Sequence, residues 1–302
     1  MNYILHLLIY FNIYAIIAIS LNMVVGYTNL LSLAHAGYYA IGCYTYALVT
    51  IKLNMGFLPA LVLAVFIAAL MSLAISLPAW RFKGDFFVLV SLSVQVFLYS
   101  LFYNWVSSDS GIDTIGTLKN LTNGPYGIPG IPKPSILSIK FDSIGMIFIL
   151  SSVLLGICLV ISWNLLKSPW GRLLKGIRDD ELLARNIGKN VRLAKIQVIA
   201  IACGMASAAG TVYASYISYI DPSSASLDDS ILFLCMVLVG GVGNFRGPIV
   251  GAAVLLLIPE MLRFLSIPDS IAANVRLLLY GLLLVLVVRL RPQGIAGEYR
   301  VE

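Results

Sequence analysis

Long apolar runs recur along the whole chain and are separated by short polar segments. A membrane-spanning helix needs about 20 such residues. Runs of this length occupy roughly 4–25, 30–51, 57–80, 85–106, 143–166, 196–220, 247–265 and 272–290. A ninth run, 229–242, is too short for a full crossing and ends in glycines, which predicts a short tilted helix or a re-entrant half-helix beside a cavity. We therefore expect an all-α, polytopic transmembrane bundle of about 8–10 spans, with nine crossings favoured, forming a single domain over residues 1–302.

The composition excludes a soluble protein. Charged residues make up 11% of the chain, against about 25% in soluble domains. Hydrophobic residues make up 60%, so the outer surface must face lipid. The formal net charge of +6 arises from basic residues in the connecting segments. Membrane topology explains this distribution better than nucleic-acid binding does, and we expect no nucleic-acid partner.

The distribution of Lys and Arg predicts the orientation in the membrane. Eight of the 20 basic residues lie in segment 167–195, which should therefore face the cytoplasm. Counting crossings from this segment places the loop 107–142 and the N-terminus outside. Five further basic residues then lie inside: Arg81, Lys83, Arg289, Arg291 and Arg300. The first span lacks a basic flank and a cleavage site, so we expect it to be retained.

The loop 107–142 is rich in glycine and proline, which indicates turns. It is either a structured connector or a segment that shapes the entrance to a pathway.

Several kinds of chemistry lack the residues they need. The four cysteines lie inside apolar runs without metal-ligand spacing, which indicates small buried hydrophobes and no metal site. The glycine-rich segment 240–247 lacks the Lys and Ser/Thr of a phosphate-binding loop. Acidic residues such as Glu260 lie toward the ends of runs, which disfavours a carrier driven by protons or sodium ions. We expect no catalytic residue, no cofactor bound by this chain, and no enzyme.

Residues 168–197 predict a folded cytoplasmic module. Ser168 is a suitable N-cap with Pro169 in the first turn, and Gly188 should end the helix. One face carries apolar residues at helical spacing: Leu173, Leu174, Ile177, Ala184 and Ile187. Such an amphipathic helix either lies on the anionic inner leaflet or docks into a groove of a cytosolic partner.

Polar residues within the apolar runs have two interpretations. Asn12, Asn22, His35, Gln95 and Gln197 are costly in lipid unless they are paired or face a cavity. Most such groups form interhelical hydrogen bonds, and the others line a solute path. Small residues around Gly37 and Gly42 should allow close helix packing.

Five segments resemble the LivM branch of branched-chain amino acid ABC transporter permeases, in order and in spacing. They are VVGYTNLLSLAHAGYYAIGCYTYAL (24–48), GDFFVLVSLSVQ (84–95), LTNGPYGIPGI (121–131), SPWGRLLKGIRDDELLARNIG (168–188) and GGVGNFRGPIVGA (240–252). The resemblance covers nearly the whole chain. It implies a multi-pass permease of a prokaryotic plasma (inner) membrane that works with a LivH-like second permease, LivG/LivF-like ATPases that use ATP, and a LivK-like substrate-binding protein.

The resemblance also implies roles for individual residues. The segment that couples the permease to the ATPases would contain Gly171, Arg172, Arg178, Asp179, Asp180, Glu181 and Gly188. Polarity at membrane depth, together with the shared motifs, suggests a translocation path lined by Asn22, Ser32, His35, Tyr38, Tyr39, Tyr44 and Gln95.

The function expected from the sequence is import of branched-chain or other hydrophobic amino acids. Related permeases for urea, short amides, ribose or nucleosides leave the cargo open. A self-sufficient channel or facilitator is the alternative from another class, and a membrane enzyme is remote.

Overall fold

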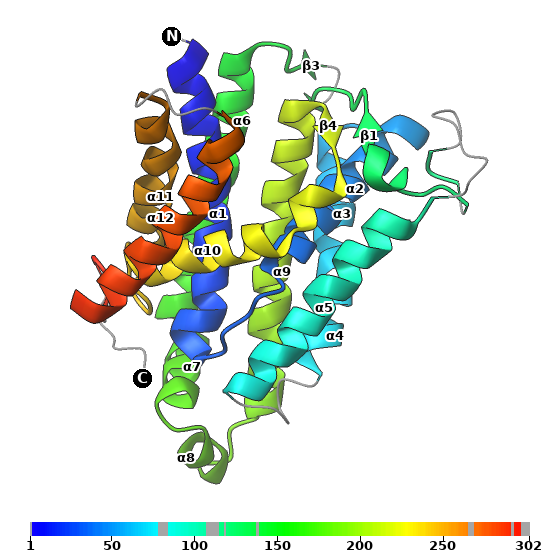
Figure 1. Ribbon diagram of the computed structural model, residues 1–302. Helices are drawn as coiled ribbons and strands as arrows, with labels where there is room; N and C mark the ends of the chain where they lie inside the picture. Colours follow the sequence, from blue (N-terminus) through cyan, green and yellow to red (C-terminus); the bar gives the residue numbers. More distant parts are fainter. Residues whose placement is uncertain are drawn as a thin grey trace.

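The described part of the chain is mostly helical, and most of its long helices run between two ends of the molecule (Figure 1). A computed structural model describes residues 2–77, 84–106, 115–117, 119–136, 139–264, 269–290 and 293–296. The helices are α1 (Asn2–Thr28), α2 (His35–Lys52), α3 (Phe57–Met71), α4 (Leu73–Ser76), α5 (Asp85–Asn104), α6 (Ile144–Lys167), α7 (Pro169–Asp179), α8 (Glu181–Asn186), α9 (Val191–Ile217), α10 (Leu227–Gly240), α11 (Gly247–Phe264) and α12 (Asp269–Leu290). The predicted all-α transmembrane fold is confirmed.

Within the described residues, five helical segments are long and apolar enough to cross a membrane: Asn2–Thr28, Phe57–Ser76, Asp85–Asn104, Ile144–Lys167 and Val191–Ile217. The last parts of the predicted span 57–80 lie outside the described residues, as do Arg81, Lys83, Arg291 and Arg300. Shorter apolar stretches occur in α11 and α12.

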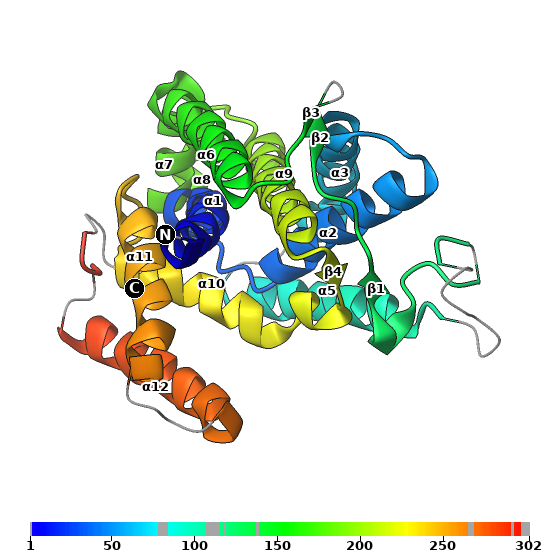
Figure 2. The same cartoon turned by 90° about the horizontal axis from the view of Figure 1, so that it is seen from above.

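Helix α9 lies at the centre of the bundle, between α1 and α2 (Figure 2). Small residues allow this close approach. A methyl group on Gly42 of α2 would lie 1.9 Å from the backbone oxygen of Ser207 on α9. A methyl group on Gly210 would lie 2.1 Å from the backbone oxygen of Tyr39. Van der Waals contact between backbones therefore replaces side-chain packing along this seam.

The predicted span 30–51 begins five residues later than expected, with His35 as the first helical residue. Asn29 adopts a left-handed conformation with φ of 54°, which ends α1. The residues that follow are non-helical although mostly buried. Two of their backbone N–H groups find side-chain partners: Leu33 donates to Ser91 Oγ at 3.0 Å and Ala34 donates to Ser32 Oγ at 3.5 Å. Gly37, in the first turn of α2, donates to Gln95 Oε1 at 2.8 Å.

A second non-helical stretch precedes α10. It runs from strand β4 (Tyr219–Ile220) through the 3-10 turn η4 (Pro222–Ala225), which is largely buried. Gln95 Nε2 donates to the carbonyl oxygens of Ala225 at 2.6 Å and Ser226 at 3.2 Å. One glutamine side chain on α5 therefore bonds both to the first turn of α2 and to the residues just before α10.

The short run 229–242 forms α10, whose 14 residues span about 21 Å. It starts beside Gln95 and leads to a turn that contacts Asn22, near the end of α1. Helix α11 then runs back, because Glu260 meets Tyr3 near the start of α1. The buried residues before α10 and α10 itself therefore carry the chain toward the end of the molecule where α1 ends. A topology with nine crossings requires this direction at this point.

The described part of the loop 107–142 and the segment 167–195 lie at opposite ends of the bundle, as the predicted topology requires (Figure 1). The described part of the loop is structured. Strand β1 (Ile128–Pro129) pairs with β4, and β2 (Ser135–Ile136) pairs with β3 (Ile139–Lys140). The loop is thereby attached to the end of α9.

A methyl group at Gly42 should weaken the α2–α9 seam. We expect Gly42→Ala to destabilise the protein by about 1–3 kcal/mol, because the seam must open to admit the methyl. Gly156→Ala is the matched control, since nothing lies within 4 Å of a methyl on that α6 glycine. Thermal unfolding in detergent measures both variants. Equal midpoints would show that the seam tolerates the extra group.

Removing the Gln95 amide should destabilise the protein more than removing a surface amide. Gln95→Met leaves the Gly37 N–H and the Ala225 carbonyl without this partner, at about 1–3 kcal/mol for each buried group. Gln197→Met removes an exposed amide that accepts a bond from Trp170 and should cost less than about 1 kcal/mol. Unfolding midpoints of the two variants decide the matter, and a similar loss in both would contradict the role of Gln95.

Candidate functional site

The segment between α6 and α9 forms two helices rather than the single helix predicted from Ser168 to Gly188. Its start is as predicted, because Ser168 Oγ accepts a hydrogen bond from Gly171 N with Pro169 in the first turn. At Asp180 the backbone becomes extended and the carboxylate accepts bonds from the N–H groups of Leu182 at 2.9 Å and Leu183 at 3.0 Å. Asp180 is thus the N-cap of α8, and this cap explains the break. Gly188 follows α8 with φ of 80°.

The inner face of this segment packs on the bundle. Leu174, Ile177 and Ala184 are buried, as the predicted apolar face requires. Gly171 allows α7 to fold back against α6, since a methyl there would lie 2.2 Å from the Leu166 backbone oxygen. Ile187 departs from the prediction and is exposed, because the break at Asp180 turns α8 away from the line of α7.

The outer end of the segment presents exposed apolar side chains. We call this group the apolar tip; it consists of Leu182, Leu183, Ile187 and Leu193, which are 62%, 58%, 67% and 52% exposed. Figure 1 shows α8 at the far end of the molecule from the N-terminus. Water is a poor environment for such a group, which is typical of an interaction surface.

Two charged groups of the segment point inward. Arg178, whose side chain is 8% exposed, donates to the Gly26 carbonyl at 2.8 Å. Glu181 forms ion pairs with Arg185 at 2.6 Å and with the buried Lys195 at 3.1 Å. These contacts attach α7 to α1 and α8 to α9.

The structure therefore divides the seven residues proposed for coupling into two groups. Gly171, Arg178 and Glu181 hold the segment in place. Arg172, Asp179, Asp180 and Gly188 lie on the exposed side.

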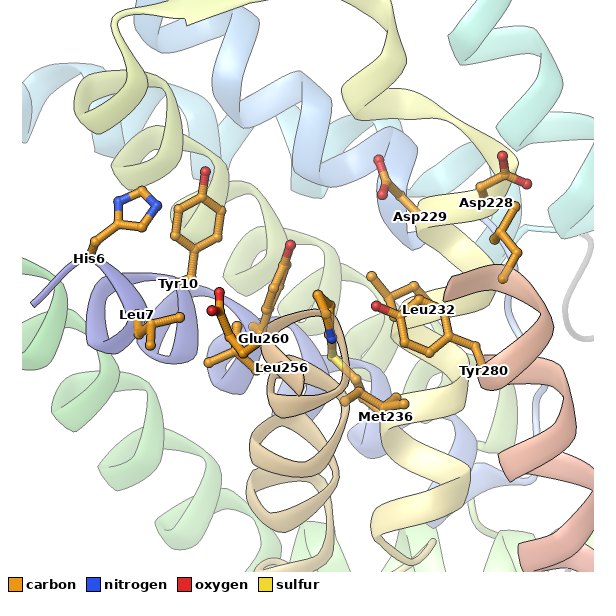
Figure 3. Close-up of a pocket in the computed structure, with 14 residues that line it drawn as sticks. His6, Leu7, Tyr10, Asp228, Asp229, Leu232, Met236, Leu256, Glu260 and Tyr280 are labelled. Atoms are coloured by element: carbon orange, nitrogen blue, oxygen red, sulfur yellow. The ribbon is translucent and has the colours of Figure 1, made fainter. Parts of the chain in front are cut away.

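A cavity of about 420 Å³ lies between α1, α10, α11 and α12 (Figure 3). It faces the half of α1 that contains the N-terminus. Its walls include His6, Tyr10 and Tyr14 from α1, Asp228, Asp229, Leu232 and Met236 from α10, Leu255, Leu256, Pro259 and Glu260 from α11, and Leu277 and Tyr280 from α12.

The cavity has distinct polar and apolar parts. Figure 3 shows Asp228 and Asp229 on one side, with His6 and Tyr10 on the other. Leu232, Met236 and Leu256 add apolar surface. Carboxylates favour an ammonium group, and the apolar surface favours an aliphatic chain.

An aromatic row continues from this cavity into the bundle. The ring of Tyr14 lies 6.2 Å from that of Phe233, and Phe233 lies 5.9 Å from Tyr39. Tyr39 also lies 5.6 Å from Tyr213. Tyr39 is therefore the predicted path residue that this row connects to the cavity.

None of the seven predicted path residues lines this cavity itself. Four form hydrogen bonds between elements: Asn22 with Gly243 and Asn244, His35 with Ser20, Tyr38 with Met71, and Gln95 as described above. Ser32 Oγ accepts a local bond from Ala34 N at 3.5 Å. The Tyr44 ring stacks on Phe102 at 4.4 Å, and its buried hydroxyl has no hydrogen-bond partner among the described residues.

The sequence prediction missed the cavity residues on α10. Asp228 and Asp229 adjoin a short apolar run, a position that suggests a solvated helix end. The short apolar run could have indicated this site, because a short apolar helix after a break in the chain is typical of solute sites in transporters.

The fold and these sites define a multi-pass membrane protein with a large exposed apolar tip at one end. A family model described as the permease component of branched-chain amino acid transport systems matches residues 3–288. The chain therefore belongs to this permease family.

Individual relatives agree with the family. The chain is 28% identical to the high-affinity branched-chain amino acid transport system permease protein LivM of Escherichia coli K12, over 96% of this chain and 69% of that protein. It is 23% identical to the probable LivM of Methanocaldococcus jannaschii, over 97% and 92%. A shorter match, 27% identical over 58% and 54%, is to the autoinducer 2 import system permease protein LsrC of Salmonella paratyphi B. No solved structure matches the chain significantly.

Proposed function

We propose that this chain is a permease subunit of an ATP-binding-cassette importer for branched-chain or other hydrophobic amino acids in a prokaryotic inner membrane. Its partners would be a LivH-like permease, LivG/LivF-like cytosolic ATPases and a LivK-like substrate-binding protein. The observation that carries the proposal is the apolar tip on a segment firmly attached to α1 and α9, in a chain of this permease family.

The apolar tip suits a protein groove better than a lipid leaflet. Helix α8 lies at the extreme end of the molecule, beyond the ends of the membrane-spanning helices (Figure 1). A groove on a cytosolic ATPase would cover the four apolar side chains.

The source of energy lies outside this chain in our proposal. The glycine-rich segment 240–247 forms a turn between α10 and α11 and lacks the lysine of a phosphate-binding loop. ATP would therefore be used by the partner subunits. Closure of the ATPases would move the coupling segment and rock the paired permeases between outward-open and inward-open states.

The cavity supports an amino acid as the cargo. Its volume of about 420 Å³ exceeds that of one aliphatic amino acid, which leaves room for water. Asp229 and Asp228 can accept the ammonium group, and Leu232 and Met236 can contact the side chain. An uncharged solute such as urea gains less from carboxylates, so amides are the second candidate cargo.

Purification and transport measurements test the proposal together. The chain is purified from its native membrane, its partners are identified by mass, and labelled leucine or urea uptake is measured in vesicles containing ATP. We expect two ATPases, a second permease and ATP-dependent leucine uptake. A homo-oligomer that moves solute without ATP would instead establish a facilitator.

A charge in the apolar tip should separate the permease from its ATPases. Leu183→Asp replaces a side chain whose burial contributes about 1.5–3 kcal/mol with a carboxylate. We expect ATPase co-purification and uptake to fall at least about tenfold, as 1.4 kcal/mol predicts. Leu53→Asp, at an exposed site beyond the far end of α2, is the control and should change neither. Retained co-purification in the Leu183 variant would argue against the docking site.

The carboxylate of Asp229 should affect the apparent affinity of the transported amino acid. Asp229→Asn removes a charge-assisted contact of about 1.5–3 kcal/mol, so KM for leucine should rise at least about tenfold. Asp221→Asn is the control, because Asp221 lies outside the cavity and accepts a bond from Ser223. Uptake at varied leucine concentration measures both, and an unchanged KM would remove the cavity from the path.

A further inference from the structure

The coupling segment is connected to the cavity walls through the end of α1. The first contact is the bond from Arg178 to the Gly26 carbonyl at 2.8 Å. Arg178 is nearly buried, so this bond is shielded from water. A movement of α7 therefore acts directly on the last turns of α1.

The second contact is made by Asn22, which lies one helical turn before Gly26 in α1. Asn22 Oδ1 accepts a bond from Gly243 N at 3.1 Å, and Asn22 Nδ2 donates to the Asn244 carbonyl at 3.0 Å. The backbones also meet closely, since a methyl on Gly26 would lie 2.6 Å from Gly243 N. Both hydrogen-bonding groups of one amide thus hold the turn between α10 and α11.

The far side of this turn is held as well. Asn244 Nδ2 donates to the Ala296 carbonyl at 2.7 Å. The N–H groups of Ile295 and Ala296 donate to the carbonyls of Val239 and Gly240, each at 2.9 Å. The turn is therefore fixed between α1 and a C-terminal segment.

The two helices that meet at this turn both form walls of the cavity. Helix α10 contributes Asp229 and Met236, and α11 contributes Leu255 and Glu260. Packed helices transmit displacement, because protein interiors are close-packed and compress little.

We infer that Arg178 and Asn22 are positioning residues that transmit movement of the coupling segment, through the end of α1, to α10 and α11. The inference rests on the proposed function. Neither residue needs to touch solute or ATPase for this role. Their loss should therefore uncouple ATP hydrolysis from uptake without abolishing either partner binding or folding.

The simpler alternative is that Asn22 only stabilises the bundle. The chain provides a matched control on the same helix, because Asn12 donates to Ser151 Oγ and Ser152 Oγ on α6, each at 2.9 Å. Asn12 is also buried but has no bond to the turn. If both asparagines are merely structural, Asn12→Leu and Asn22→Leu should behave alike.

The experiment uses the complete importer, purified with its partners and reconstituted in vesicles with the loaded binding protein. Leucine uptake and ATP hydrolysis are measured in the same vesicles, and their ratio is the readout. For Asn22→Leu we expect the ratio to fall about tenfold or more, within the usual range of coupling between sites. For Asn12→Leu the ratio should stay within about twofold of wild type.

Variants of Arg178 provide an independent arm. Arg178→Met should lower the ratio of uptake to ATP hydrolysis, as Asn22→Leu does. Arg178→Lys keeps a donor for the Gly26 carbonyl, so its ratio should lie between those of Arg178→Met and wild type. Because both residues belong to one route, the double variant should lose little more than either single variant. A full additive loss, or no rescue by lysine, would overturn the inference.

The outcomes distinguish a failure of the proposed function from a failure of the proposed link through Arg178 and Asn22. A wild-type complex without ATP-dependent uptake would contradict the proposed function. A working wild-type complex in which Asn22→Leu keeps the normal ratio would contradict only the link.

Discussion

The need to satisfy every backbone polar group in a dry interior shapes this molecule most strongly. Two segments inside the bundle are not helical, and lipid offers no substitute for their missing hydrogen bonds. Gln95 bonds to the helix turn that follows the first segment, through the Gly37 N–H, and to the end of the second, through the Ala225 and Ser226 carbonyls. This one amide fixes where α2 and α10 begin, and so fixes the α10 wall of the cavity.

The end of the molecule formed by α7 and α8 follows a different physical logic. Its inner contacts are ion pairs and buried hydrogen bonds of Arg178, Glu181 and Lys195, whereas its outer surface carries exposed leucine and isoleucine. A rigid base beneath an apolar surface suits a part that receives force from a partner. Since Gly171 packs directly on the end of α6, little movement can be lost within the segment itself.

Local patterns in the sequence predicted much of the fold. Apolar run length predicted the five long apolar helical segments, and Ser168 with Pro169 predicted the start of α7. The break at Asp180 was missed, because a charged surface residue and an N-cap look alike within a helical pattern. Polarity at membrane depth identified Asn22 and Gln95 as important but could not distinguish a solute contact from an interhelical bond.

Features that depend on distant residues could not be predicted. The cavity joins His6 to Glu260 and Tyr280, and no spacing rule connects positions so far apart in the chain. The bond from Arg178 to Gly26 is equally remote and uses a backbone oxygen, which no side-chain pattern reveals.

Cross-linking from the apolar tip tests the central claim most directly. The four native cysteines are buried, so a Leu183→Cys variant would offer one accessible thiol for a short photoactivated cross-linker in intact membranes. We expect a cross-link to a cytosolic ATPase, identified by mass. Cross-links only to lipid, or only to a second copy of this chain, would contradict it.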